Sequence, residues 1–244
     1  MPLTALPLNT SDIPRSDLDI RDQVRTNPLP WRGQFSPQLV ESLLTRYAEP
    51  GAAVLDPFVG SGTVLGECAR LGLAASGTEI NPAAVILAHL YEWANQPRAE
   101  RKIAVDALVA SIDRLVARKH CIDGDITASA PLRPQDVAAC VRTTPSPHER
   151  RLLEAALVLA DPAWSEVAVG RLMDARRRVR EFLLGLPYSE RPINVFHADA
   201  RNVPIRDGTV DLVLTSPPYI NVFNYHQQYR PAVDYAAALK VTIA

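Results

Sequence analysis

Short apolar runs alternate with helical periodicities at both ends of this chain. Residues 52–56 (Ala-Ala-Val-Leu-Asp) form an apolar run that is typical of a buried strand. Similar runs lie within residues 73–79, at 192–196 and at 208–215. Because a helical pattern separates the first run from the second, the order predicts parallel strands of an α/β sheet.

Apolar positions at helical spacing predict three helices around the first two strands. Ser36 is a suitable N-cap, and Pro37 follows it at the first helical position. A second helix is predicted over residues 64–71. A third helix, over residues 83 to about 94, begins behind the N-cap residue Asn81.

The alternation breaks in the middle of the chain, where residues 97–190 have an almost entirely helical pattern. Amphipathic stripes predict helices over residues 103–117, 148–159 and 164–184, and residues 122–147 are expected to form loop or short helices. This block interrupts a minimal α/β unit, so we interpret it as a helical insertion between the second and third strands.

These patterns predict a Rossmann-like α/β fold with a partial sheet of about four parallel strands. The sheet domain is expected to comprise residues 31–96 and 191–244, with the helical insertion at 97–190. Residues 1–30, rich in Pro, Asp, Ser and Thr, predict an irregular N-terminal arm that wraps the domain or contacts a partner.

Composition narrows the classes of function. The 244 residues are 47% hydrophobic with a formal net charge of −1, so nucleic-acid binding would need a local basic face. The three cysteines are far apart and form no C-x-x-C pair, which argues against a zinc site or a disulfide scaffold and fits a reducing cytoplasm. No signal pattern and no apolar run near the ~20 residues of a membrane span is present. We therefore expect a cytoplasmic protein without metal or membrane.

A glycine-containing turn follows the first strand. In residues 56–63 (Asp-Pro-Phe-Val-Gly-Ser-Gly-Thr), the glycines allow close approach of a ligand to backbone N–H groups. The spacing is not G-x-G-x-x-G, and the Gly-Lys pair of a phosphate-binding loop is absent. A cofactor without phosphates fits this turn best, although an ordinary strand-to-helix turn has the same residues.

Two acids follow later strands. Glu79 ends the second strand about 20 residues after the glycines, where a ribose-binding acid belongs. Asp199 follows the third strand and is placed to meet the amino group of an adenine ring. For a lone Glu such as Glu79, a solvated acid at a strand end is the more common explanation, and a turn or helix-cap role explains Asp199 equally well.

The fourth strand ends in Ser216-Pro217-Pro218-Tyr219. The two prolines fix φ and lack N–H groups, so this loop is stiff and not helical. Its hydroxyl, carbonyls and aromatic ring suit a flat ring that carries an amino group. A structural β-turn is the alternative. The turn, the two acids and this loop all follow strands on one rim of one sheet, which favours a binding site.

Together these motifs resemble the S-adenosylmethionine-dependent DNA amino-methyltransferases. The resemblance rests on residues 56–63, 77–82 (Gly-Thr-Glu-Ile-Asn-Pro), 199–201 and 211–219. Residues 31–37 (Trp-Arg-Gly-Gln-Phe-Ser-Pro) resemble the N-terminal cofactor-side motif of this family. The Ser-Pro-Pro-Tyr form is similar to the cytosine-N4 branch, because the adenine-N6 branch more often has Asp or Asn in place of the serine.

The resemblance implies a cofactor site for S-adenosylmethionine. Asp56 and the loop that ends at Thr63 would hold its methionine part, Glu79 the ribose and Asp199 the adenine. Ile80 and Ala200 would pack beside the adenine, and Phe35 and Ser36 would close over the cofactor. The full implied set is Phe35, Ser36, Asp56, Pro57, Phe58, Gly60, Ser61, Gly62, Thr63, Glu79, Ile80, Asp199 and Ala200.

The resemblance also implies the catalytic loop and its substrate. Ser216 and the carbonyl of Pro217 would accept hydrogen bonds from the target amine, beside Pro218, and Tyr219 would stack on the base. These bonds would make the poorly nucleophilic amine more reactive. A base in a duplex must be flipped out before it reaches such a loop. Residues beyond the loop that could touch the extruded nucleotide are Asn224, Tyr225, His226, Tyr229 and Arg230. A solvated helix start is the alternative for these residues.

The sequence therefore predicts a DNA cytosine-N4 methyltransferase and leaves three alternatives open. Adenine-N6 or RNA amino groups suit the same loop, and a non-catalytic subunit is the third reading. We expect a restriction-modification context, and DNA contact through the Arg-rich insertion. The family's sheet normally continues through three more strands, whereas this chain ends about 25 residues after Tyr219. We therefore expect a fragment, a degenerate remnant, or a chain completed by a second polypeptide.

Overall fold

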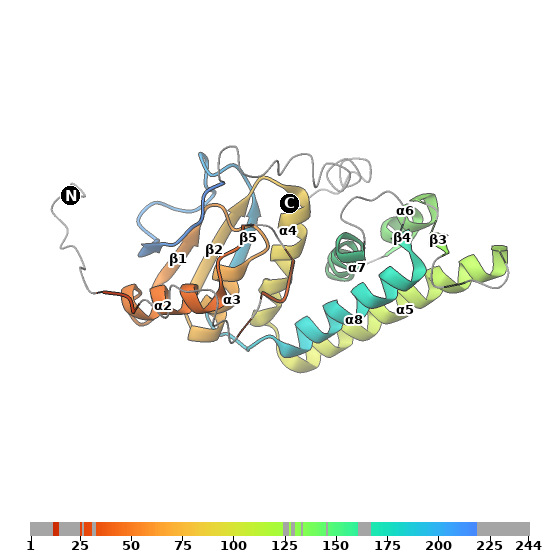
Figure 1. Cartoon of the computed structure of the whole chain (residues 1–244), viewed down its shortest axis with the longest axis horizontal. Helices are drawn as coiled ribbons and strands as arrows, with labels where there is room; N and C mark the ends of the chain where they lie inside the picture. The colour runs from red at the N-terminus through yellow and green to blue at the C-terminus, as the bar shows by residue number, and fades with distance from the viewer. Residues whose placement is uncertain are drawn as a thin grey trace.

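A parallel sheet of four strands forms the centre of the protein. The computed structural model describes residues 12–14, 25, 27–30, 33–123, 127, 130–132, 134–144, 146–160 and 167–218. The strands are β1 (Ala53–Asp56), β2 (Ala74–Glu79), β5 (Ile193–His197) and β6 (Leu212–Val213), in the order β5-β2-β1-β6. All three pairings are parallel. The predicted α/β fold with a helical insertion is thereby confirmed (Figure 1).

The fourth strand is shorter than the sequence predicts. The prediction of a strand over residues 208–215 is wrong in extent, because only Leu212–Val213 pairs as strand with β1. Gly208 has a φ of 74° in a turn, and the Thr209 hydroxyl donates to a carbonyl within that turn. The Asp211 side chain accepts from the Ala53 N–H at 2.8 Å. The chain therefore becomes extended only when it reaches the edge of β1.

The helices around the sheet begin within one residue of the predicted positions. They are α2 (Pro37–Tyr47), α3 (Thr63–Leu71), α4 (Pro82–Ala88) and the 3₁₀ helix η3 (His89–Asn95). Ser36 and Asn81 cap α2 and α4 through their side chains, as predicted. The predicted third helix is α-helical only to Ala88, and its last part is the tighter η3. From η3, Glu92 accepts a hydrogen bond from the Val195 N–H of β5 at 2.8 Å.

The segment between β2 and β5 is mostly helical. It contains α5 (Arg98–Asp123), α6 (Pro134–Thr143), α7 (Pro147–Ala160) and α8 (Val169–Gly185), with the two short strands β3 (Pro131–Leu132) and β4 (Val167–Ala168). Helix α8 begins at Val169, whereas Trp164, where the sequence predicts its start, lies outside the described residues. The antiparallel β3–β4 pair was not predicted. Helices α5 and α8 run side by side away from the sheet (Figure 1).

Two side chains hold the ends of this helical segment. Arg101 of α5 is 3% exposed and donates to the Leu183 carbonyl at the end of α8 at 3.0 Å. Asn95 donates to the Ser189 carbonyl and accepts from the Ile193 N–H, both at 2.9 Å. The entry and the exit of the segment are thus joined to each other and to β5. That residues 97–190 form a separate insertion domain remains a prediction.

One hydrophobic core runs from the sheet into the helical segment. The N-terminal arm contributes to it, because Leu29 is only 1% exposed. Arg25 of the same arm forms an ion pair with Glu67 of α3 at 2.8 Å. Arg25 and Leu29 therefore attach the end of the arm to the sheet domain. Among the helices of the described ranges, none has the length and apolarity needed to cross a membrane.

Candidate functional site

The parallel sheet brings four predicted features to one edge. Asp56 and Glu79 are the last residues of β1 and β2, Asp199 follows β5 by two residues, and Ser216 follows β6 by three. Carboxyl ends of parallel strands share an edge, and ligands bind there in open α/β sheets. Side-chain hydrogen bonds link these ends directly. The Thr215 hydroxyl donates to Asp56, and Glu79 accepts from the turn after β1.

The glycine-containing turn has a backbone shape that requires glycine. Gly60 and Gly62 have φ values of 53° and 102°, in the region that other residues rarely adopt. The Val59 N–H donates to the Thr78 carbonyl of β2 at 3.0 Å, and the Gly60 N–H donates to Glu79 Oε2 at 3.1 Å. The turn is therefore fixed by β2 at two consecutive residues before α3 begins.

Asp56 is buried at the base of this turn. It is 3% exposed, and its Oδ1 accepts from the Phe58 N–H at 3.1 Å and from the Thr215 hydroxyl at 2.6 Å. Burial raises the pKa of Asp56 to about 6, although both hydrogen bonds lower it; the nearby Glu79 adds a smaller upward shift. The carboxylate is thus mainly ionised at neutral pH and can hold a cationic group.

Glu79 orders the turn through three backbone N–H groups. Its Oε1 accepts from Ile80 at 2.9 Å and from Asn81 at 2.8 Å, whereas Oε2 accepts from Gly60. Burial raises the pKa of Glu79, and the three hydrogen bonds lower it. Oε2 keeps capacity for a further donor, such as a ribose hydroxyl. Ile80 beside it is 58% exposed, so an apolar surface adjoins the carboxylate.

Asp199 is half-buried and already paired. The Arg201 guanidinium donates to it from Nη2 at 2.6 Å and from Nε, and the Arg201 N–H donates to Oδ1. These hydrogen bonds hold the pKa of Asp199 at about 2. Its carbonyl also accepts from the Asn202 N–H in a turn. The turn role of Asp199 is thereby observed, whereas its contact with adenine stays a prediction in which the adenine amino group would compete with Arg201.

Several residues of the predicted cofactor set already form hydrogen bonds with other residues of the protein. The Ser36 hydroxyl caps α2, and Ser61 is 2% exposed and accepts from the Gln34 side chain. The Asn27 side chain donates to the Phe35 carbonyl at 2.9 Å and accepts from the Thr63 hydroxyl. These contacts attach the N-terminal segment to the glycine turn. Gln34 and Asn27 were not predicted, and no local pattern singles them out.

The loop that the sequence predicts to be catalytic is described only in part. Ser216 is half-buried, whereas Pro217 and Pro218 are exposed. The Leu214 N–H donates to the Leu55 carbonyl at 3.0 Å, which continues the pairing with β1 up to the loop. The predicted residues that lie outside the described ranges are Tyr219, Asn224, Tyr225, His226, Tyr229 and Arg230. Thr215, which the sequence analysis missed, directly precedes the loop.

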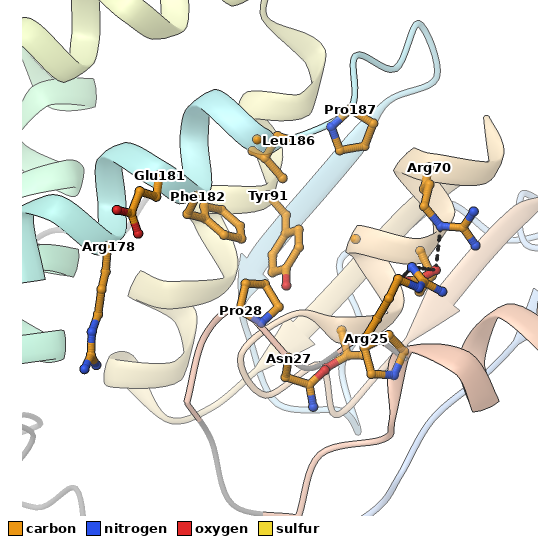
Figure 2. A pocket seen from close by; sticks show the side chains of 15 residues that line it. Arg25, Asn27, Pro28, Arg70, Tyr91, Arg178, Glu181, Phe182, Leu186 and Pro187 are labelled. Atoms are coloured by element: carbon orange, nitrogen blue, oxygen red, sulfur yellow. Dashed lines mark hydrogen bonds and ion pairs between the residues drawn. The ribbon is translucent and has the colours of Figure 1, made fainter. Parts of the chain in front are cut away.

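A cavity of about 590 Å³ lies beside α3, and Thr63 at the start of that helix is among its lining residues. In Figure 2 the Tyr91 hydroxyl points into it, toward Asn27 and Pro28. The Tyr91 ring also packs edge-on against Phe182 of α8, with ring centroids 5.0 Å apart. The cavity therefore joins the N-terminal arm, α3 and the helical segment. Over the described ranges, no three His, Cys, Asp or Glu side chains are grouped to hold a metal ion.

The first part of the chain matches known DNA methylases. Residues 14–89 match the N6/N4 methyltransferase family, whose description is DNA methylase. The Type II methyltransferase M.MjaII of Methanocaldococcus jannaschii is 37% identical over 79 residues. This part of the chain is similar to the N4/N6 DNA methyltransferases. The resemblance stated from the motifs is thereby confirmed, and no solved structure matches the chain.

The match covers only part of each protein. The 79 residues amount to 32% of this chain and 15% of the relative. The family match includes Asp56 and Glu79 but ends at residue 89, before Asp199 and Ser216. It therefore supports the family without distinguishing a cytosine-N4 from an adenine-N6 target.

Proposed function

We propose that this chain binds S-adenosylmethionine and carries the amine-binding loop of a DNA methyltransferase that acts on the N4 amine of cytosine. The observation that carries the proposal is the hydrogen-bonded edge of the sheet. There Glu79 holds the glycine turn through Gly60, and Asp56 holds the loop through Thr215. One edge thus combines a site for a cofactor with a site for an amine.

The residues at this edge fit the chemistry of the cofactor. Asp56 offers an ionised oxygen to an ammonium group, and Glu79 Oε2 can accept from a ribose hydroxyl. The exposed side chain of Ile80 offers an apolar surface to an adenine ring. The turn lacks the basic residue that a phosphate would require. These features support a nucleoside with a cationic amino-acid tail rather than a nucleotide.

The loop residues would activate the amine. S-adenosylmethionine, when bound, supplies an electrophilic methyl group on a sulfonium. The Ser216 oxygen and the Pro217 carbonyl would accept from the two N–H groups of the amine and stabilise the positive charge that develops on it. The methylated amine then releases a proton, which water can accept. Alignment of the amine with the methyl group supplies much of the remaining rate.

Cofactor binding tests the first half of the proposal. Isothermal titration with S-adenosylmethionine is expected to detect one site, and Glu79→Gln is expected to weaken it by about tenfold or more, because a charge-assisted hydrogen bond is lost. Glu100→Gln is the matched control, since Glu100 is exposed on α5. Equal affinities for the two variants would place the ribose contact elsewhere.

Methyl transfer tests the second half. The chain is incubated with tritiated cofactor and DNA, and the nucleosides are then identified by mass spectrometry. N4-methylcytosine is expected, and Ser216→Ala is expected to lose about 10²-fold or more in rate. Detection of N6-methyladenine instead would show that adenine is the target. Label found only in RNA would show that RNA, and not DNA, is the substrate.

A subunit role is the alternative, and the same assay separates it. Cofactor binding without methyl transfer would indicate a chain that needs a second polypeptide. The assay is then repeated with the product of the neighbouring reading frame. A neighbouring endonuclease gene would support the proposed restriction-modification context.

A further inference from the structure

Thr215 joins the two halves of the proposed site. Its hydroxyl donates to Asp56 Oδ1 at 2.6 Å across a sequence separation of 159 residues. Asp56 is 3% exposed and ends β1, whereas Thr215 directly precedes the Ser216 loop. The acceptor is therefore a residue proposed to hold the cofactor, and the donor lies in the segment that leads into the amine-binding loop.

The loop depends on this side chain because its backbone has few donors. Leu214 is the residue at which the chain still pairs with β1, through its N–H and the Leu55 carbonyl. Pro217 and Pro218 have no N–H to contribute. The Thr215 hydroxyl thus makes, one residue before Ser216, a connection to β1 that the two prolines cannot make.

We propose that Thr215 is a positioning residue, which couples the ionised state of Asp56, and hence cofactor binding, to the placement of the Ser216 loop. This inference rests on the proposed function. A hydroxyl donates more strongly to a carboxylate than to a neutral acid. Cofactor binding that requires ionised Asp56 therefore strengthens the bond to Thr215, and by linkage a well-placed loop favours cofactor binding.

The surroundings of Asp56 make the effect measurable. Among the described residues, the titratable groups that interact electrostatically with Asp56 are Glu79 at the end of β2 and Cys68 of α3. No cation is coupled to Asp56 within the described ranges, so hydrogen bonds oppose the effect of burial. Removing the Thr215 donor is therefore expected to raise the pKa of Asp56 further.

The test compares the full chain with Thr215→Val, Thr215→Ser and Thr209→Val. Valine keeps the shape of threonine and removes the hydroxyl, whereas serine keeps the donor. Thr209 is the matched control, because its hydroxyl donates to the Arg206 carbonyl instead. The Asp56 pKa is measured without cofactor by carbon NMR of labelled aspartate, and Asp56→Asn identifies the signal. Thermal unfolding verifies that each variant folds.

Thr215→Val is expected to raise the pKa of Asp56 by about one unit or more, since a hydrogen bond to a charged group is lost. Affinity for S-adenosylmethionine should then fall several-fold at pH 6.5 and recover near pH 8.5. Thr215→Ser should restore the pKa and the affinity, and Thr209→Val should change neither. A loss of affinity equal at both pH values would indicate a merely structural role and would overturn the inference.

The inference and the proposed function fail in different ways. An unchanged Asp56 pKa in Thr215→Val overturns the inference and leaves the proposed function standing. A wild-type chain that does not bind S-adenosylmethionine overturns the proposed cofactor site, and the inference is overturned with it. A shifted pKa together with a pH-dependent loss of affinity supports both.

Discussion

Gly66 of α3 provides a stability test in which one substitution should have opposite effects in two backgrounds. A Cβ at Gly66 would lie 2.5 Å from Cε1 of the Tyr91 ring, closer than real Cβ atoms approach. The ring is 4% exposed and packs edge-on against Phe182 (Figure 2), so it can give way only by shifting toward the cavity that it lines. Gly66→Ala therefore places a methyl group in occupied space.

Two opposing terms set the size of the effect. Overpacking in a filled core costs about 1–3 kcal/mol. Alanine in a helix interior is about 1 kcal/mol more favourable than glycine. The contact at Gly66 is short and its neighbour is a rigid ring, so the cost falls at the upper end of its range. We expect a net destabilisation of about 1–2 kcal/mol.

Removing the ring reverses the sign. Tyr91→Ala alone should cost about 3–5 kcal/mol, because a buried aromatic side chain is deleted. In that background Gly66→Ala should stabilise by about 1 kcal/mol, since only the helix preference remains. Urea unfolding of the four proteins, followed by circular dichroism, measures the coupling. Gly185→Ala is the control: nothing lies within 4 Å of its Cβ, so it should be neutral or stabilising.

The same substitution should also reach the proposed cofactor site. The Gly66 N–H donates to the Gly62 carbonyl, so a shift of α3 moves the glycine turn. Affinity for S-adenosylmethionine is therefore expected to fall with stability in Gly66→Ala. Additive costs in the four proteins, with no coupling between the two positions, would refute the assigned contact with Tyr91.

Three further predictions concern buried polar groups. Glu154 is 4% exposed, its Oε1 lacks a hydrogen-bond partner among the described residues, and burial raises its pKa to about 7. Because this pKa is raised, the stability that depends on the protonated form of Glu154 is complete below its ordinary pKa and is lost as pH rises through 7. In urea unfolding, Glu154→Gln should therefore stabilise the protein by up to about 3 kcal/mol at pH 8.5 and by very little at pH 4. Asn95→Ala removes the acceptor of the Ile193 N–H and should cost about 1–3 kcal/mol in the same assay, whereas exposed Gln96→Ala should change stability little. Because the pKa of Asp56 is about 6, affinity for S-adenosylmethionine should fall by about tenfold per pH unit below that value, and titration calorimetry of Asp56→Asn should show weak binding without this pH dependence.

The elements that the sequence predicted well have local causes. The glycines after β1 and the caps Ser36 and Asn81 act within a few residues of their position, so their roles are visible in the sequence. The fourth strand was overestimated because an apolar run does not state how much of it pairs. At the edge of the sheet only Leu212–Val213 forms strand with β1, and the flanking Asp211 and Leu214 each add a backbone hydrogen bond to it. The switch of α4 to the 3₁₀ helix η3 likewise depends on contacts with β5.

In the candidate site, the acidic residues were predicted from the sequence, whereas their hydrogen-bond partners were not. Its acids were predicted because each follows an apolar run, and parallel strands bring such residues to one edge. The partners of these acids were not predicted. Glu79 accepts hydrogen bonds from three backbone N–H groups, Asp199 is paired with Arg201, and Ser61 accepts a hydrogen bond from Gln34. None of these pairings follows from residue type or spacing.

The sequence by itself determined the class of fold, the residues with chemical potential and the resemblance to DNA amino-methyltransferases. Periodicity, capping and turn residues are short-range properties, and they act before the chain is folded. The tertiary structure decided which of those residues meet. The bond between Thr215 and Asp56 spans 159 positions and exists only because β6 lies beside β1. Long-range contacts depend on packing of the whole core, which no local pattern records.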